Sequence, residues 1–390
     1  MAVETDHHIV IINRNYPPRT GVTGESACVL ARWLQENLGY RVSIVTVRSN
    51  YAGGGSKLDP VGEVHEIASW YDGKRKLLRL CSTFIECFLL VLKARRLKAD
   101  STIVMTDPSF LSSWASVLLG RKRHWGLWSM DLFPEAFVAS KLVTDRNIFY
   151  RFLFWLVYRC PPRYLIALGD LQARYLQECY GAEIPTAILP CGVYDATTVA
   201  DPPDWKTENS NRIILGYCGN LGEAHSVDFL QSVIRNMDPE KFHLVLTVYG
   251  AKSESFLQQL DDSQDGVSLI GSVSRPQLGF IDVHLVSLLG RWANVCVPSK
   301  AVSAVCSGSS FLFYGIEQCD NWEMLKDAGW LVPQTSDIDQ MDAAVSAILD
   351  SLSEQSLESK KTAARDIARN LLDSESHAFS QIGALVTQSQ

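Results

Sequence analysis

Apolar runs alternate with helical patterns along the chain. An apolar run at residues 8–13 is followed by a polar loop, a stretch of helical periodicity through Leu38 and a second apolar run at residues 42–47. Short continuous runs of this kind are typical of strands that are buried on both faces, as in parallel sheets. Three further runs, at residues 101–105, 125–130 and 164–167, continue the alternation. The pattern predicts a parallel sheet covered by helices.

The pattern stops near Asp195 and then starts again. Residues 196–211 are polar, include Pro202 and Pro203, and show no apolar period, so we expect them to be a linker. The second series of apolar runs lies at residues 212–217, 244–249, 267–270, 283–288, 311–314 and 330–332.

We therefore predict an α/β protein with two tandem Rossmann-like domains. The N-terminal domain is expected at residues 1–195 and the C-terminal one at 212–373, followed by a weakly patterned tail at 374–390. Doubly wound sheets bind ligands at the carboxyl ends of their strands, and two domains facing each other would form an interdomain cleft. The loops after the strands are where we expect the chemistry.

Composition limits the class of protein. A chain of 390 residues is too long to fold around a single hydrophobic core, so two domains are expected. Its content of 47% hydrophobic and 20% charged residues is ordinary for globular proteins. The ten cysteines contain no Cys-x-x-Cys pair, and no apolar run reaches the length of a membrane span. The acidic start of the chain is unlike a signal peptide. These features favour a cytoplasmic protein with reduced thiols, and the histidines show no metal-ligand spacing.

A glycine-containing loop follows the first run of the second series. Gly219, Asn220, Leu221 and Gly222 precede a helix expected to begin near Ser226. Glycines let the backbone approach a ligand, and a helix N-terminus offers free N–H groups to a diphosphate. The loop does not fit Gly-x-Gly-x-x-Gly, which argues against a nicotinamide cofactor. The alternative is an ordinary strand-to-helix turn.

A second loop carries two cations. Arg291 and Lys300 flank it, and Ser299 and Lys300 lead into a helix expected at residues 301–306. Two cations near a helix start suit a sugar diphosphate, because negative charge grows on the leaving group as the glycosidic bond breaks. The alternative for Lys300 is a solvated lysine at a helix start.

Six segments, taken in their order along the chain, resemble those of a known family. They are Tyr16-Pro17-Pro18, residues 21–25, Thr106-Asp107-Pro108, residues 131–135, residues 217–222 and residues 297–300. The chain resembles family 4 glycosyltransferases of the GT-B fold, in particular the branch similar to the bacterial fucosaminyltransferases of surface-polysaccharide synthesis. The resemblance covers roughly residues 8 to 335.

The resemblance implies a retaining transfer of sugar from a nucleotide-diphosphate sugar to a hydroxyl acceptor, with no metal or other cofactor. The acceptor would be a surface polysaccharide or a lipid-linked glycan. Asp131 and Glu135 would face the cleft, with Asp131 accepting a hydrogen bond from the incoming hydroxyl. For Glu135 the alternative is a charge that favours a helix N-terminus.

The resemblance also assigns a loop in the N-terminal half. Gly21, Thr23 and Gly24 would belong to the glycine-bearing loop that closes over the donor phosphates. Alternatively, Thr23 caps the helix that follows.

The chain departs from the family after Lys300. Many relatives carry two glutamates eight positions apart, the second of which can hold the nucleotide ribose, whereas this chain has Val295 and Ser303. A serine cannot make a charged bidentate contact with two ribose hydroxyls. We therefore predict that the ribose contact lies between Ser303 and the acidic loop at residues 317–323, including Asn321 and Glu323. A solvated acidic loop is the alternative.

Basic and aromatic residues gather in the N-terminal half, at residues 74–76, 93–96, 121–123 and 147–159. Such segments can rest on an anionic bilayer, so the protein is expected to dock peripherally on the inner face of the cytoplasmic membrane, unless the aromatic helix is core. No nucleic-acid partner is expected. Two other functions stay open: a nucleotide-sugar epimerase of the same fold, and a catalytically degenerate scaffold in a polysaccharide assembly complex.

Overall fold

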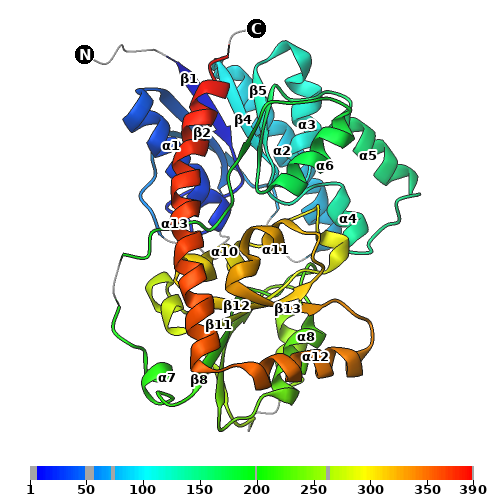
Figure 1. Cartoon of the computed structure of the whole chain (residues 1–390). Coiled ribbons are helices and arrows are strands. Elements are labelled where there is room, and N and C mark those ends of the chain that lie inside the picture. The colour runs from blue at the N-terminus through cyan, green and yellow to red at the C-terminus, as the bar shows by residue number, and fades with distance from the viewer. Residues whose placement is uncertain (1–6, 49–56, 72–74, 198–199, 261–263, 389–390) are drawn as a thin grey trace. The chain divides into compact units, whose positions relative to one another are not determined.

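The computed structural model of the chain describes residues 7–48, 57–71, 75–197, 200–260 and 264–388. The chain forms two compact units (Figure 1). The first comprises residues 1–191, 294–297 and 374–390, and the second comprises residues 192–293 and 298–373.

The first unit is built on a parallel sheet of seven strands in the order β3-β2-β1-β4-β5-β6-β7. The strands are β1 His8–Ile12, β2 Arg41–Arg48, β3 Glu63–Ala68, β4 Ser101–Met105, β5 Trp125–Trp128, β6 Tyr164–Ala167 and β7 Thr186–Ile188. All five predicted strands are present. The two that were not predicted, β3 and β7, lie at the edges of the sheet, where β3 is largely exposed and lacks a continuous apolar run.

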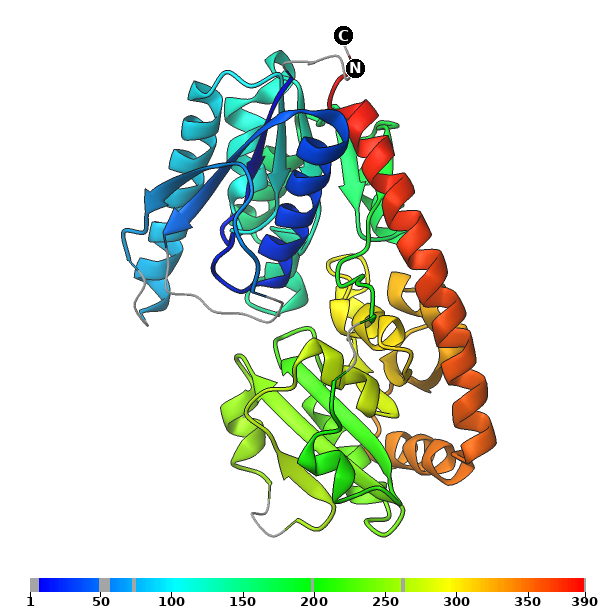
Figure 2. The same ribbon diagram turned by 90° about the vertical axis from the view of Figure 1, so that its left-hand side faces the viewer.

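Helices cover both faces of this sheet, and Figure 2 shows α1 and α2 on opposite sides of it. The helices of this unit are α1 Val22–Leu38, α2 Lys76–Arg96, α3 Leu111–Leu118, α4 Glu135–Ala139, α5 Ile148–Tyr158 and α6 Asp170–Tyr180, with a 3-10 turn η1 Gly120–Lys122. β1 and β4 are buried along their whole length, which explains why apolar residues predominate in both strands.

The second unit is built on a parallel sheet of six strands in the order β10-β9-β8-β11-β12-β13. These are β8 Ile213–Asn220, β9 Phe242–Tyr249, β10 Val267–Leu269, β11 Val283–Ser287, β12 Ser310–Gly315 and β13 Gly329–Pro333. All six coincide with predicted runs. The helices are α7 Asp204–Thr207, α8 Val227–Asn236, α9 Ser253–Leu257, α10 Ser299–Cys306, α11 Asp320–Leu325, α12 Ile338–Ser351 and α13 Glu354–Leu385. Three 3-10 turns, η2 Arg275–Phe280, η3 Gly290–Trp292 and η4 Lys326–Ala328, complete the unit.

The larger core of this unit lies between the sheet and the pair α8 and α12. Phe229 of α8 stacks on Tyr314 of β12 with ring centroids 5.3 Å apart, and Val345 of α12 is fully buried in the same cluster. The apolar face of α8 thus fixes the helix that follows β8, and with it the loop that joins them.

The division of the chain differs from the predicted one in several places. The first unit ends at Cys191 rather than at residue 195, and the predicted linker contains α7, whose Trp205 is buried against Ile214 and Val245. A single buried tryptophan does not produce a periodic apolar pattern, so the sequence of residues 196–211 did not indicate that part of it is buried.

Residues 374–390 are not a separate tail. α13 extends to Leu385, and its last turns belong to the first unit, where Phe379 contacts Trp33 with ring centroids 5.8 Å apart and the Gln381 Nε2 donates to the carbonyl of Thr186 at 2.9 Å. The buried positions recur at helical spacing, at Ala378, Phe379, Ile382, Leu385 and Val386. No helix of the described residues is long and apolar enough to cross a bilayer.

Candidate functional site

Each sheet has a topological switch point, at which the strand order reverses direction. In the second unit β8 lies between β9 and β11, and in the first unit β1 lies between β2 and β4. Ligands of doubly wound sheets bind in the crevice beyond the carboxyl ends of the strands at this switch point.

Gly219 lies at the end of β8, not after the strand as predicted. Its φ is +124°, a conformation that favours glycine, and a Cβ placed there would lie 2.9 Å from Cε of Lys300. The side chain of Lys300 therefore lies directly against the backbone of the predicted glycine loop. The sequence placed these two residues in one site, and the structure brings them together.

Lys300 is the second residue of α10 and reaches back to the end of β8. Its Nζ donates to the carbonyl of Asn220 at 2.5 Å and to the hydroxyl of Tyr217 at 3.3 Å, and lies 2.9 Å from Nε2 of His225. The ammonium group also lies 5.0 Å from the centroid of the Tyr217 ring. The positive charge is thus held by several contacts at the switch point of the sheet.

His225 is a residue of this site that sequence reasoning missed. It is buried, and its Nδ1 lies 2.6 Å from the carbonyl oxygen of Ser287. Burial, together with the charges of Lys300 and Lys252, holds the pKa of His225 well below its ordinary value. The imidazole is therefore neutral at pH 7; its Nδ1–H donates to Ser287 and its Nε2 accepts from Lys300. The signal in the sequence was the position of His225, three residues after Gly222.

Lys252 adds a second cation, also missed, in the loop after β9. Its Nζ donates to the carbonyl of His225 at 2.8 Å and lies 3.7 Å from the carboxylate of Glu223. Desolvation lowers the pKa of Lys252, Glu223 opposes this shift, and the nearby charge of Arg291 adds to it. Arg291, in η3 after β11, is exposed. The carboxyl ends of β8, β9 and β11 therefore gather three cations, two of which the sequence predicted.

Leu221, by contrast, is part of the core. Its side chain is fully buried in the α8 cluster and its N–H donates to the carbonyl of Tyr249 at 2.6 Å. The side chain and the N–H of Leu221 are thus already engaged within the unit, and its contact with a donor stays a prediction. Gly222 lies against the Asn220 amide, since a Cβ there would be 3.3 Å from its Nδ2, and its carbonyl accepts from the N–H of His225 at 3.1 Å.

Ser299 and Ser303 of α10 contact the segment that opens the second unit. The hydroxyl of Ser303 donates to the carbonyl of Gly192 at 3.1 Å, and a Cβ on Gly192 would lie 2.8 Å from both the Ser299 carbonyl and the Ser303 Oγ. Gly192 has a φ of +91°. Ser303 therefore holds the chain in place, and this contact gives no indication of a ribose site.

The acidic loop divides into buried and exposed members. Asn321 is fully buried, and its Nδ2 donates to the carbonyl of Pro298 at 2.9 Å, immediately before α10. Asn321 thus positions the start of α10 instead of facing solvent. Glu323, in the first turn of α11, is exposed and stays a candidate for the ribose contact.

In the first unit, two carboxylates follow neighbouring strands, one at the switch point and one after the next strand. Asp107 follows β4 and accepts from Nδ2 of Asn15 at 3.1 Å, while Asp131 follows β5. Desolvation by surrounding protein atoms, aided by the charge of Asp107, raises the pKa of Asp131 to about 6, although part of the Asp131 surface meets solvent. Burial likewise raises the pKa of Asp107, against the opposing charge of Arg14. The sequence predicted Asp131 and overlooked Asp107 and Arg14 as members of this group.

Glu135 does not face solvent. It is buried at the start of α4, where it accepts a short hydrogen bond from Tyr158 and another from Tyr175 at 3.3 Å. Burial raises the pKa of its carboxyl. The side chain of Glu135 is buried because it bonds the two tyrosines, on α5 and α6, and its predicted role in the reaction stays a prediction.

The loop before α1 has mainly packing contacts. A Cβ on Gly24 would lie 2.7 Å from the carbonyl oxygen of Asn15, so glycine lets α1 approach the loop after β1. The hydroxyl of Thr23 accepts from Nδ2 of Asn13 at 3.2 Å. α1 begins at Val22 after Gly21 and has no side-chain cap, so the alternative of Thr23 as a cap is wrong. The contact of Gly21, Thr23 and Gly24 with donor phosphates stays a prediction.

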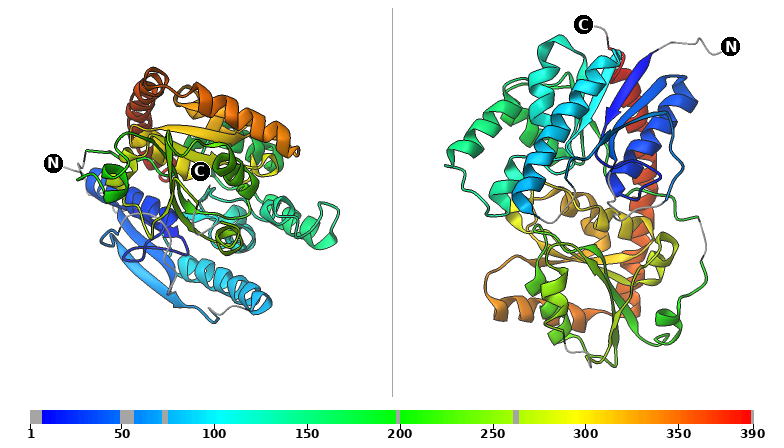
Figure 3. Two further views of the ribbon diagram at one scale, coloured as in Figure 1. Left: turned by 90° about the horizontal axis from the view of Figure 1, so that it is seen from below. Right: turned by 180° about the vertical axis from the view of Figure 1, so that it is seen from behind.

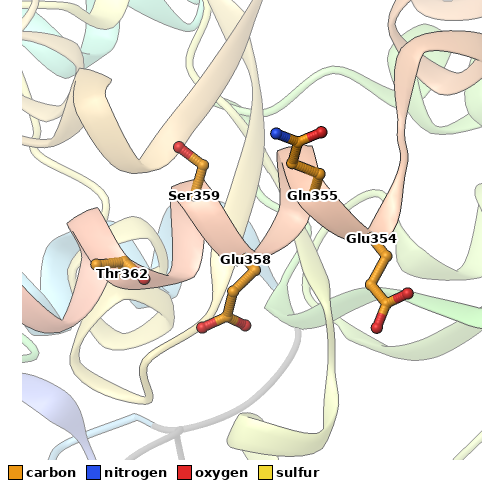
Figure 4. A pocket seen from close by; sticks show the side chains of 5 residues that line it. All are labelled: Glu354, Gln355, Glu358, Ser359 and Thr362. Carbon is orange, nitrogen blue, oxygen red and sulfur yellow. The ribbon is translucent and has the colours of Figure 1, made fainter.

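A hollow at the start of α13 lies elsewhere. Figure 4 shows that its lining side chains all come from this one helix; they are Glu354, Gln355, Glu358, Ser359 and Thr362. None belongs to the loops after β8, β9 or β11, so the hollow brings no elements together. Within the described residues, no group of three His, Cys, Asp or Glu side chains is placed to hold a metal ion.

Comparison with known proteins gives a fold. No family model and no curated protein matches the sequence. Among solved structures, the sucrose-phosphate synthase of Thermosynechococcus elongatus is 14% identical, with a TM-score of 0.71 over 97% of this chain and 98% of that one. A trehalose-6-phosphate structure from E. coli bound with UDP-2-fluoro glucose is 12% identical, with a TM-score of 0.69 over 98% and 99%.

A third similar structure is WaaG, a glycosyltransferase involved in lipopolysaccharide biosynthesis. It is 15% identical, with a TM-score of 0.67 over 98% of this chain and its own whole length. Each match extends through both units. The predicted fold is confirmed: the chain has two Rossmann-like units with parallel sheets, of the GT-B type.

Proposed function

We propose that the chain is a nucleotide-sugar-dependent glycosyltransferase that retains the anomeric configuration. The donor diphosphate binds at the carboxyl ends of β8, β9 and β11. The observation that carries this proposal is the ammonium group of Lys300, held at the switch point by Asn220, Tyr217 and His225. A fixed cation at this position stabilises the charge that develops on a departing nucleoside diphosphate, and it does so without a metal ion.

The first unit supplies the acceptor side of the reaction. Asp107 lies at the switch point of its sheet and Asp131 follows the neighbouring strand β5; in its ionised form Asp131 accepts a hydrogen bond from the attacking hydroxyl. A uridine-diphosphate sugar is the first donor to test, since a structure with this fold binds UDP-2-fluoro glucose.

The experiment measures release of nucleoside diphosphate from a panel of nucleotide sugars, with and without glycan and lipid-linked acceptor extracts. Release that needs an acceptor supports a transferase, whereas conversion of the donor alone supports an epimerase. Absence of release with every donor, together with absence of any nucleotide-induced rise in melting temperature, would reject both enzymes.

Lys300→Met gives the sharper form of this experiment. We expect a loss of about ten- to one-hundredfold in affinity for UDP, because a charge-assisted hydrogen bond is worth about 1.5–3 kcal/mol. Lys326→Met, in the η4 turn, removes an exposed lysine of the same unit and should leave the affinity unchanged. Equal affinities of wild type and Lys300→Met would contradict the assignment of the site.

We further propose that the acceptor is a lipid-linked or surface glycan and that the first unit docks on the cytoplasmic face of a membrane. α2, α3 and α5 lie side by side along one face of this unit (Figure 3, right). Large apolar side chains on them are exposed, among them Phe84 and Ile85 of α2, Val117 of α3, and Ile148, Phe152 and Trp155 of α5.

Basic residues accompany this apolar face. Arg79 and Arg95 on α2, Arg121 and Arg123 beside α3, and Arg151 on α5 are exposed. An apolar helix surface with flanking arginines is the composition that binds the interface of an anionic bilayer. The predicted basic segment at residues 74–76 lies partly outside the described residues.

Sedimentation with vesicles tests this docking. Phe152→Ser with Trp155→Ser should reduce binding to phosphatidylglycerol-containing vesicles by at least tenfold, since each buried aromatic contributes more than 1 kcal/mol. Ile338→Ser, at a residue of the second unit with 56% of its surface exposed, is the matched control and should bind like wild type. Equal loss in both variants, or no binding by wild type, would argue against the surface.

A further inference from the structure

The contacts of His225 give it a role in the second unit that goes beyond packing. We propose that His225 is a positioning residue for the diphosphate site, whose neutral imidazole accepts a hydrogen bond from Lys300 and so fixes the direction of the ammonium group. The inference rests on the proposed function, since it concerns the same diphosphate.

The geometry fixes the tautomer. Nδ1 of His225 lies 2.6 Å from the carbonyl oxygen of Ser287, an atom that can only accept, so the proton of the neutral ring must be on Nδ1. Nε2 then carries a lone pair, and it lies 2.9 Å from Nζ of Lys300. An ammonium group has three protons and cannot accept, so the hydrogen bond runs from Lys300 to His225.

The surroundings of the ring keep it neutral. The side chain is buried. Nζ of Lys300 lies beside the ring, and Nζ of Lys252 donates to the backbone carbonyl of His225 at 2.8 Å. The ring of Tyr217 packs edge-on, with centroids 6.3 Å apart. No carboxylate among the described residues forms an ion pair with the ring, and a second positive charge beside Lys300 would be repelled.

The consequence concerns how the lysine is used. The carbonyl of Asn220 and Nε2 of His225 each accept from Nζ, which anchors the flexible four-carbon side chain before any ligand arrives. Preorganised charges stabilise a developing anion better than mobile ones, because they need not reorganise during the reaction. Removing His225 should therefore weaken phosphate binding through Lys300, while leaving contacts to the nucleoside unchanged.

Two substitutions separate the two ring nitrogens. Asn can place its amide N–H near the position of Nδ1 and so keep the donor to Ser287, but it offers no acceptor to Lys300. Gln can place its carbonyl oxygen near the position of Nε2 and so keep the acceptor. The pair His225→Asn and His225→Gln therefore distinguishes a packing role from a positioning role.

Calorimetric titration with inorganic pyrophosphate and with UDP tests the inference. We expect His225→Asn to lose about tenfold in affinity for both, and His225→Gln less than threefold. In the Lys300→Met background, His225→Asn should cause no further loss. Melting temperatures of all variants separate these effects from unfolding, and ¹⁵N NMR of the wild type should show a neutral ring protonated on Nδ1 at pH 7.

Each outcome decides a different question. If the wild type binds pyrophosphate and Lys300→Met weakens it, the site stands; an unchanged affinity in His225→Asn, or the same loss in the Lys300→Met background, would then overturn the role of His225. A ring protonated on Nε2 or doubly protonated at pH 7 would also overturn it. If the wild type binds neither pyrophosphate nor UDP, the proposed function itself fails, whatever the tautomer.

Discussion

The ionised form of Asp131, which the proposed reaction uses, lowers the stability of the folded protein. Its carboxyl lies near that of Asp107, and desolvation and this neighbouring charge raise its pKa to about 6. For a carboxyl with a raised folded-state pKa, the folded state binds its proton more tightly than the unfolded chain does. The free energy of unfolding therefore falls as pH rises through the interval from about 4 to about 6. Groups placed against their own solvation in this way are typical of sites that bind or react.

The pH dependence of transfer follows from this pKa. If ionised Asp131 accepts a hydrogen bond from the attacking hydroxyl, kcat/KM should fall about tenfold for each pH unit below about 6. Asp107→Asn removes a negative charge that raises this pKa, so the midpoint of the fall should move to lower pH. A profile that stays level between pH 5 and 7 would contradict the role of Asp131.

Glu135 illustrates a buried carboxyl with a structural role. Glu135→Ala leaves the hydroxyls of Tyr158 and Tyr175 without this acceptor, and we expect it to lower the free energy of unfolding by about 2–4 kcal/mol. Glu135→Gln keeps an acceptor and should cost under about 1 kcal/mol, since burial already disfavours the ionised form. Denaturant titration measures both. A loss of transfer activity in a stably folded Glu135→Gln would instead return Glu135 to the reaction.

At the scale of elements, the start of α10 is fixed from several directions. Gly192 packs against Ser299 and Ser303, and Asn321 bonds the carbonyl of Pro298. Lys300 lies between these contacts, so the elements hold the position of its helix while its side chain reaches β8. This arrangement explains why serine is accommodated at position 303, where the resemblance leads one to expect glutamate.

Restoring the glutamate should not restore a ribose contact. Ser303→Glu would place a carboxylate beside the carbonyl oxygen of Gly192, which repels it, so we expect a lower melting temperature and no gain in UDP affinity. Ser303→Ala is the matched control and should cost about 1 kcal/mol through the lost hydrogen bond alone. A gain of tenfold or more in UDP affinity for Ser303→Glu would show that the side chain can turn toward the nucleotide.

The sequence predicted elements better than contacts. Buried strands such as β4 and β11 are short runs in which apolar residues predominate, and their bounds were predicted within a residue. Edge strand β3 has no such run, because one of its faces meets solvent. In the site, the glycines and Lys300 have a recognisable spacing. The partners of Glu135, the core position of Leu221 and the tautomer of His225 depend on distant residues, which no local pattern records.

At the scale of the molecule, the first unit is assembled from separated parts of the chain. Residues 294–297 contribute Val295, whose carbonyl accepts from the N–H of Leu132 at 2.8 Å, and the last turns of α13 contribute Phe379 and Gln381. The N-terminal sheet therefore depends on segments that are distant in sequence.

Phe379→Ala tests this dependence. Removing a buried phenylalanine that contacts Trp33 should lower the free energy of unfolding by about 3–5 kcal/mol. His377→Ala, at an exposed position of the same helix, should change it by less than about 0.5 kcal/mol. Equal stabilities of the two variants would mean that the end of α13 is dispensable for the first unit.

The path of α13 also bears on biosynthesis. The strands of the first unit leave the ribosome early, yet the helix that covers Trp33 and Leu38 is translated after the whole of the second unit. During translation those apolar side chains have no permanent cover, and chaperones recognise such surfaces. In nascent chains stalled before residue 374, α1 should therefore be sensitive to protease. In the released full-length protein, α1 should be protected.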